Sequence, residues 1–97
     1  MKIMEIGAAT GRYSHYFAQK GFEVDAVELI EHNIEVFKTK TLPGENVRIK
    51  QGNALDLSEY PDNSYDATLL LGPMYHLYTA NEQQKALSEA IRITKPE

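Results

Sequence analysis

The sequence predicts an α/β protein in which helices cover both faces of a doubly wound parallel sheet. Apolar segments of strand length alternate with segments whose apolar residues recur at helical spacing. Small residues, among them Gly7 and Gly11, follow the first apolar segment directly and lead into the first helical segment. Alternation of this kind favours right-handed crossovers, which place consecutive strands parallel in one sheet.

The first half of the chain predicts two strands, each followed by a helix. We expect the strands at residues 3–6 and 22–28 and the helices at residues 11–20 and 31–40. Gly21 stands just past the first helix and predicts its end. The apolar stripe of that helix is expected to consist of Tyr13, Tyr16 and Phe17.

The second half predicts two more strands, a long connection and a last helix. We expect the strands at residues 47–49 and 65–71, separated by a connection over residues 51–64. A capping box, either Thr79 with Glu82 or Asn81 with Gln84, opens the last helix. Its inward stripe is expected to consist of Leu87, Ala90, Ile91 and Thr94.

Composition excludes several classes of protein. The chain has 97 residues, 25% of them charged, a formal net charge of -4 and no cysteine. No apolar run is long enough to span a bilayer, and the lysines and arginines are scattered, so we expect neither a membrane nor nucleic acid as the main partner. Without a signal-peptide pattern the sequence predicts a cytoplasmic protein. We expect no metal site, because cysteine is absent and the few histidines are dispersed, with His15 and His32 facing solvent.

The turn after the first strand predicts a ligand site. Backbone N–H groups converge where a strand, a tight turn and a helix N-terminus meet, and the helix dipole there favours an anionic group. Small residues from Gly7 to Gly11 permit close approach of a ligand to the backbone. Glu28, at the end of the second strand, can accept hydrogen bonds from both hydroxyls of a ribose.

Several motifs resemble those of the class I S-adenosylmethionine-dependent methyltransferases, in the order in which that family has them. Glu5-Ile-Gly7-Ala-Ala-Thr-Gly11 resembles the family's first motif, with Ala9 where a glycine is common, and Glu28 matches the ribose-binding acidic residue. Residues Gly52–Leu57 resemble the family's adenine-side segment, with Asn53 where the family often has aspartate. Two further stretches resemble the fourth-strand motif with its loop and the helix that runs into a Lys-Pro turn, namely residues 65–77 and 86–96.

The resemblance implies a Rossmann-like methyltransferase fold, with strand order 3-2-1-4 and three layers, α/β/α. Residues 1–97 would be one S-adenosylmethionine-binding methyltransferase domain, truncated before the family's C-terminal strands. The open edge of the fourth strand could then pair with a second copy of the chain to form a homodimer. The implied reaction is methyl transfer to a small-molecule acceptor that the sequence does not identify.

The same resemblance implies which residues bind the cofactor. Leu29 or Ile30 would pack on the adenine, Asn53 would accept from its amine, and the Leu71 carbonyl would accept from the amino group of the methionine part. Tyr75 and His76 are the candidates for contact with the acceptor or for removing its proton. The full predicted set of cofactor-binding residues is Glu5, Gly7, Ala8, Ala9, Thr10, Gly11, Glu28, Leu29, Asn53, Ala54 and Leu71.

Other interpretations stay open at this point. A nicotinamide-binding oxidoreductase module would also place an acidic residue after the second strand, although the glycine pattern of that fingerprint is broken by Ala9 and Arg12. A non-catalytic cofactor-binding or interaction fragment is a further alternative. Asn53 and Asp56 could equally be turn residues that satisfy the local backbone.

Overall fold

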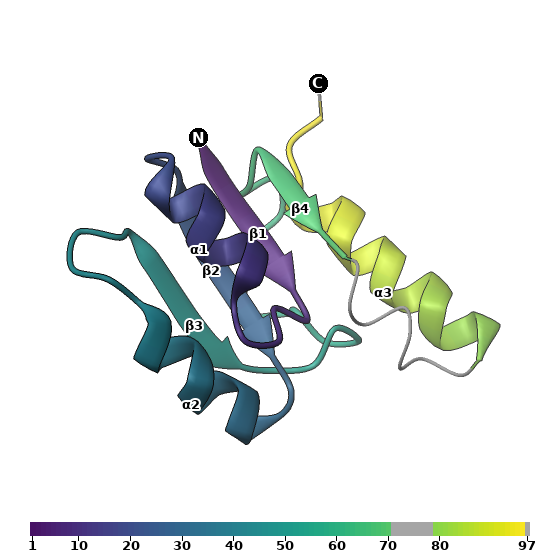
Figure 1. The fold of residues 1–97 in the computed structure, drawn as a ribbon. Coiled ribbons are helices and arrows are strands. Elements are labelled where there is room, and N and C mark those ends of the chain that lie inside the picture. Colours follow the sequence, from purple (N-terminus) through teal and green to yellow (C-terminus); the bar gives the residue numbers. More distant parts are fainter. Residues whose placement is uncertain (71–78, 97) are drawn as a thin grey trace.

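The structure, a computed structural model of the protein, describes residues 1–70 and 79–96 (Figure 1). Three of the expected site residues, Leu71, Tyr75 and His76, lie outside the described residues. Strands and helices alternate along the described chain as far as the third strand. The elements are β1 (Lys2–Ile6), α1 (Arg12–Gln19), β2 (Glu23–Glu28), α2 (Glu31–Lys40), β3 (Val47–Gln51), β4 (Ala67–Leu69) and α3 (Ala80–Ile93).

The strands form one parallel sheet in the order β3-β2-β1-β4, which confirms the predicted fold class and strand order. In the register of this sheet, Met4 lies opposite Asp25 on one side and Thr68 on the other. The helices α1 and α2 cover one face and α3 covers the other, giving three layers (Figure 1). No helix of residues 1–70 and 79–96 has the length and apolar character needed to cross a membrane.

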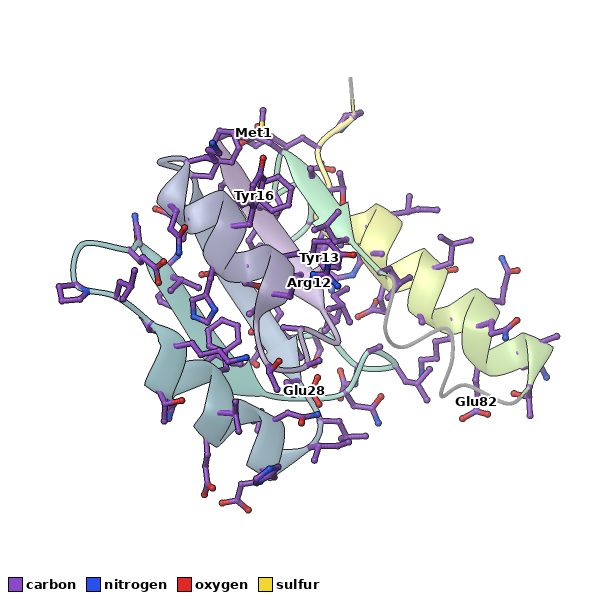
Figure 2. All side chains as sticks on the ribbon, in the orientation of Figure 1. Met1, Arg12, Tyr13, Tyr16, Glu28 and Glu82 are labelled. Atoms are coloured by element: carbon purple, nitrogen blue, oxygen red, sulfur yellow. The ribbon has the colours of Figure 1, made fainter. Side chains whose placement is uncertain are left out.

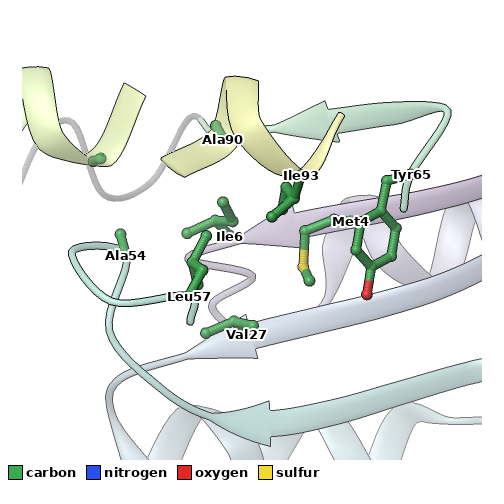
Figure 3. Packing of buried hydrophobic residues seen from close by; sticks show 9 residues of the cluster. Met4, Ile6, Val27, Ala54, Leu57, Tyr65, Ala90 and Ile93 are labelled. Carbon is green, nitrogen blue, oxygen red and sulfur yellow. The ribbon is translucent and has the colours of Figure 1, made fainter. Parts of the chain in front are cut away.

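Alternation of side chains along the strands divides the core between the two faces. Met4, Ile6 and Val27 point toward α3, where they meet Leu57 and Ile93 in the larger cluster of buried residues (Figure 3). The opposite face holds a smaller cluster with Ala8, Ala26 and Phe37. The larger cluster therefore includes residues of the long connection between β3 and β4.

The predicted apolar stripe of α1 was wrong for Tyr13 and Tyr16, while its third member, Phe17, is half-buried against Phe22. Tyr13 and Tyr16 point outward (Figure 2) and are 44% and 55% exposed, whereas the buried residues of α1 are Ser14, His15 and Ala18. Glu5 of β1 faces α1 and accepts a hydrogen bond from Ser14, so the buried side of this helix carries a polar pair. A tyrosine counts as apolar in a periodicity, but its hydroxyl is readily solvated at the surface.

His15 is also buried, contrary to the expectation that it faces solvent, while His32 is exposed as expected. The ring of His15 lies 4.4 Å from that of Phe37, centroid to centroid, and its Nε2 is 3.0 Å from Oγ1 of Thr41. A hydroxyl partner and an aromatic neighbour make burial of a histidine tolerable. The histidine therefore joins α1 to the end of α2.

Helix α3 begins with the first of the two predicted capping boxes. The N-cap is Thr79, whose Oγ1 accepts from the backbone N–H of Glu82. The predicted inward stripe was wrong in part, because Leu87 and Ile91 are 44% and 65% exposed. Ala90 is buried as predicted, and the other buried residues of this helix are Ala86 and Ile93.

The fourth strand is shorter at its start than predicted, since β4 begins at Ala67 instead of Tyr65. Tyr65 forms an isolated bridge with Thr94 and donates its backbone N–H to the carbonyl of Ile93. Its buried side chain donates a hydrogen bond to Asp25 of β2. Among the described strands β4 lies at an edge of the sheet, and pairing of two copies through that edge stays a prediction.

Candidate functional site

A cavity of about 350 Å³ lies at the carboxyl ends of β1, β2 and β3. This is where ligands bind in open parallel sheets, and the volume falls within the range of about 300–1,000 Å³ found for small-molecule sites. Its described lining residues come from the turn after β1, the end of β2, the first turns of α2 and α3, and the segment after β3. They are Ile6, Gly7, Ala9, Val27, Glu28, Leu29, Ile30, Asn33, Gly52, Asn53, Ala54, Leu55 and Glu82.

The turn between β1 and α1 has a left-handed backbone at several positions. Gly7, Ala9 and Gly11 have φ values of 74°, 53° and 96°. The backbone N–H groups of Gly7 and Ala8 donate to the carbonyl of Val27, at 2.7 and 3.1 Å. These two amides are therefore engaged with β2, so an anionic group at this turn would need other donors.

Gly11 has a second reason to be glycine. A Cβ atom at this position would lie 2.5 Å from Cε1 of His15 and 2.6 Å from Cδ2 of Phe37. Real Cβ atoms do not approach other atoms so closely, and a positive φ strains any side-chain-bearing residue. The buried His15–Phe37 pair thus packs directly beneath the turn that borders the cavity.

Glu28 ties the turn after β1 to the start of α2. Its Oε1 accepts the backbone N–H of Ala9 at 2.9 Å, and its Oε2 accepts the N–H of Ile30 at 3.2 Å and Nδ2 of Asn33 at 3.0 Å. A carboxylate offers about four lone-pair sites, so three protein donors leave little capacity for further ones. To accept hydrogen bonds from both hydroxyls of a ribose, the Glu28 carboxylate must lose at least one of these donors. Asn33 is the donor on a rotatable side chain.

Glu5 lies beneath the same turn and is 4% exposed. Its Oε1 accepts a hydrogen bond from Oγ of Ser14 at 2.5 Å. Burial raises the pKa of the Glu5 carboxyl above its usual value, the Ser14 hydrogen bond opposes that shift, and the nearby charge of Glu28 adds to it. Glu5 is therefore a buried acid at the base of the site.

The segment after β3 forms the opposite wall of the cavity. Its start is fixed by Gly52, whose N–H donates to the carbonyl of Glu28 at 3.1 Å. Oδ1 of Asn53 accepts the N–H of Leu55 at 2.9 Å, and the carbonyl of Asn53 accepts the N–H of Asp56 at 3.0 Å. Asn53 is thus a turn residue, as one of the two interpretations had it, and it lines the cavity as well.

The predicted cofactor-binding residues fall into three groups. Those that line the cavity are Gly7, Ala9, Glu28, Leu29, Asn53 and Ala54. Within the described chain, Glu5, Ala8, Thr10 and Gly11 are not part of its lining. The third group is Leu71, which, like the candidate catalytic pair Tyr75 and His76, is outside the described residues.

Two polar lining residues were missed by the sequence analysis as parts of the site. Asn33 stands in the first turn of α2, and its role could have been inferred because it follows the acidic residue by about one helical turn. Glu82 was recognised as a capping residue, and Figure 2 shows it at the start of α3. Nothing local in the sequence indicates that this first turn borders the cavity.

The charged groups of the cavity favour a cationic ligand. Among its described lining residues the only charged ones are Glu28 and Glu82, and both are acidic. The buried Glu5 lies close enough to Glu28 for the two charges to interact. An anionic group such as a pyrophosphate would meet repulsion here, whereas a positively charged sulfonium or ammonium would be attracted.

Comparison with known proteins identifies the family. The family described as "Methyltransferase domain" matches residues 3–97. A demethylmenaquinone methyltransferase of Renibacterium salmoninarum is 30% identical over 95 residues, which cover 98% of this chain and 37% of that protein. An S-adenosyl-L-methionine-dependent Diels-Alderase of Talaromyces variabilis is 27% identical and is matched over 98% of this chain and 33% of its own length.

A solved structure extends the similarity to three dimensions. The crystal structure of an S-adenosylmethionine-dependent methyltransferase from Methanosarcina mazei superposes with a TM-score of 0.88 at 26% identity, covering 98% of this chain and 48% of that one. The chain thus spans roughly a third to a half of the length of these three proteins. The nicotinamide-binding alternative is not favoured by these matches. The chain belongs to the methyltransferase domain family, among the class I S-adenosylmethionine-dependent methyltransferases.

Proposed function

We propose that the cavity binds S-adenosylmethionine and that the chain is the cofactor-binding part of an enzyme that methylates a small-molecule acceptor. The observation that carries the proposal is the position of Glu28, whose carboxylate lines the cavity and bonds to Ala9 of the turn after β1. A ribose at this point would replace the Asn33 side chain as the donor to Glu28. The adenine would lie between Leu29 and the wall formed by Asn53 and Ala54.

The charge of the cavity supports this ligand over a dinucleotide. S-adenosylmethionine carries a sulfonium and an ammonium group, and the described lining supplies only acidic charge, from Glu28 and Glu82. The carbonyl of Leu71 remains the proposed acceptor for the ammonium group, and Glu5 remains a proposed cofactor-binding residue. A nicotinamide dinucleotide would bring a pyrophosphate without a basic partner in the described lining.

A bound S-adenosylmethionine would supply an activated methyl group, with the carbon–sulfur bond electrons left on sulfur when an acceptor's nucleophile takes the methyl carbon. The chain's residues are proposed to orient this donor and to exclude water from the reacting atoms. Tyr75 and His76 remain the candidates for holding the acceptor or taking its proton. The name of one relative, demethylmenaquinone methyltransferase, gives a small molecule as the acceptor of that protein.

Calorimetric titration tests the binding part of this proposal. We expect heat and saturation with S-adenosylhomocysteine and none with NAD at the same concentrations. Binding of NAD, or no binding of either compound at millimolar concentration, would contradict the proposal. Binding of S-adenosylhomocysteine without methyl transfer to any small-molecule acceptor tested would support only the binding part of the proposal.

A further inference from the structure

The segment between β3 and β4 must be held by specific contacts. In residues 52–66 the backbone forms no helix or strand ladder, and it pairs with other segments through one isolated bridge, Tyr65 with Thr94, and through single hydrogen bonds. Its first residues, 52–55, nevertheless form a wall of the cavity. Because backbone freedom costs roughly 1–2 kcal/mol per residue, a wall of this kind keeps one shape only if other contacts fix it.

The side chain of Arg92 in α3 makes three of those contacts. Its Nη2 donates to the carbonyl of Leu57 at 2.8 Å, and its Nη1 donates to the carbonyl of Tyr60 at 2.9 Å and to Oδ1 of Asp62 at 2.8 Å. A guanidinium presents its donors in a planar fork, which lets one side chain reach several carbonyls at once. One residue of α3 therefore spans the segment from residue 57 to residue 62.

Glu89, one turn earlier on α3, completes the arrangement. Its Oε2 accepts the backbone N–H of Leu57 at 2.8 Å, and its two oxygens accept from Arg92 at 3.0 and 3.2 Å. Leu57 is thus bonded through both its N–H and its carbonyl, and its side chain is buried in the core (Figure 3). We call Glu89 and Arg92 together the α3 clamp.

The α3 clamp lies away from the cavity but close to its wall along the chain. Neither Glu89 nor Arg92 is among the described residues that line the cavity. The fixed Leu57 follows the wall residue Leu55 by two positions, and the other end of the wall is held by Gly52, which donates to the carbonyl of Glu28. The wall is therefore held by hydrogen bonds to β2 at one end and to α3 at the other.

We propose that Arg92 and Glu89 are positioning residues that hold the wall at residues 52–55 in the shape that accepts the adenine ring. This inference rests on the proposed function, because the wall is taken as the adenine side of an S-adenosylmethionine site. Hydrogen bonding by Arg92 also lowers the pKa of Glu89, so the clamp keeps both of its charges at neutral pH. Loss of the clamp should loosen the wall and weaken discrimination between purines.

The test compares two ligands in the wild type and in Arg92→Gln. The ligands are S-adenosylhomocysteine and its inosine analogue, in which a carbonyl replaces the adenine amine. We expect the wild type to prefer the adenine compound and Arg92→Gln to lose at least about tenfold in affinity for it, with a smaller loss for the inosine analogue. The ratio of the two affinities is the decisive quantity, because a loss of stability alone would reduce both affinities by the same factor.

A matched control is available in Arg48→Gln. Arg48 also bonds to two carboxylates, those of Asp25 and Glu23, but it lies on β3 outside the described lining of the cavity. We expect this variant to keep both affinities within about twofold of the wild type. Titrations are run at a temperature where circular dichroism shows each variant folded, and Glu89→Gln gives a milder second change if Arg92→Gln does not fold.

Each outcome is decisive. A lower preference for adenine in Arg92→Gln or Glu89→Gln, with Arg48→Gln unchanged, supports the inference. A wild type that binds S-adenosylhomocysteine while the clamp variants keep its preference for adenine overturns the inference and leaves the proposed function standing. A wild type that does not bind S-adenosylhomocysteine at millimolar concentration overturns both.

Discussion

At the scale of single residues, Gly11 shows how the core constrains the turn after β1. Its positive φ and the 2.5 Å approach of a Cβ to His15 both exclude a side chain. We predict that Gly11→Ala lowers the free energy of unfolding by about 2 kcal/mol or more, because backbone strain and a steric clash add. Chemical denaturation followed by circular dichroism measures the change.

A control separates those two causes. Gly21 has a similar φ of +92°, but a Cβ there would meet nothing within 4 Å. Gly21→Ala should therefore report the backbone strain alone, at about 1 kcal/mol. Equal losses of unfolding free energy in the two variants would mean that a clash with His15 and Phe37 adds nothing at Gly11.

Glu5 gives a prediction about pH at the same scale. Its folded-state pKa is raised above the usual value by burial, so between those two values the folded chain binds more protons than the unfolded chain. Its contribution to stability is therefore full below the unfolded pKa and is lost as the pH rises through the folded pKa. We predict that Glu5→Gln is more stable than the wild type at neutral pH and that the difference shrinks toward pH 4.

Denaturation curves from acid to neutral pH test the Glu5 prediction. Gln can still accept the hydrogen bond that Ser14 donates to Glu5 in the wild type, so the change removes mainly the buried charge. The exposed Glu35 of α2 provides a control variant, Glu35→Gln, which replaces a carboxyl at the surface and should change stability by less than about 0.5 kcal/mol. A Glu5→Gln variant that is less stable at neutral pH than at acid pH, relative to the wild type, would disprove the assignment.

At the scale of elements, α3 depends on its first turn. Thr79 accepts the N–H of Glu82 at 3.1 Å, and its hydroxyl donates to the carboxylate of Glu82 at 3.0 Å. We predict that Thr79→Ala lowers the free energy of unfolding by about 1 kcal/mol, because an exposed N-cap loses its side-chain acceptor. The control is Thr39→Ala, an exposed threonine inside α2, which should change stability by less than about 0.5 kcal/mol. Equal effects of the two changes, measured by denaturation, would rule out the capping role.

The elements also show where sequence reasoning succeeds and where it does not. Order, type and approximate bounds of the strands follow from apolar runs, and the N-cap of α3 follows from Thr79 and Glu82. The buried faces of α1 and α3 do not follow, because they depend on partners distant in sequence. His15 packs against Phe37, and α3 packs into a core cluster that includes Leu57 and Tyr65.

The candidate site divides in the same way. The turn after β1, the acidic residue after β2 and the segment after β3 meet at one cavity because the carboxyl ends of parallel strands meet at one edge. Glu82 could not be assigned to that cavity from spacing alone, since it enters the cavity from the first turn of α3, whereas the position of Asn33 soon after Glu28 could have indicated its role. The donors that occupy Glu28 depend on the turn after β1 and on the start of α2, which approach one another only in the folded chain.

At the scale of the whole molecule, the chain has the sheet order and the motifs of its family but matches only part of its relatives' length. The acidic lining, together with the cavity's place at the sheet edge, favours a cationic cofactor such as S-adenosylmethionine. The acceptor and the catalytic groups are proposals that depend on residues outside the described ones. Cofactor binding is therefore the central claim that this chain can test by itself.

Nuclear magnetic resonance of the backbone amides tests that claim most directly. On titration with S-adenosylhomocysteine, we expect the shifts to change at the turn after β1, at the end of β2 and in the wall after β3. The expected amides are those of Gly7, Ala9, Leu29, Ile30, Gly52, Ala54 and Leu55. Arg48, in the first half of β3 and outside the described lining of this cavity, should keep its shift. Unchanged spectra at millimolar ligand, or changes confined to residues away from the cavity, would contradict the account.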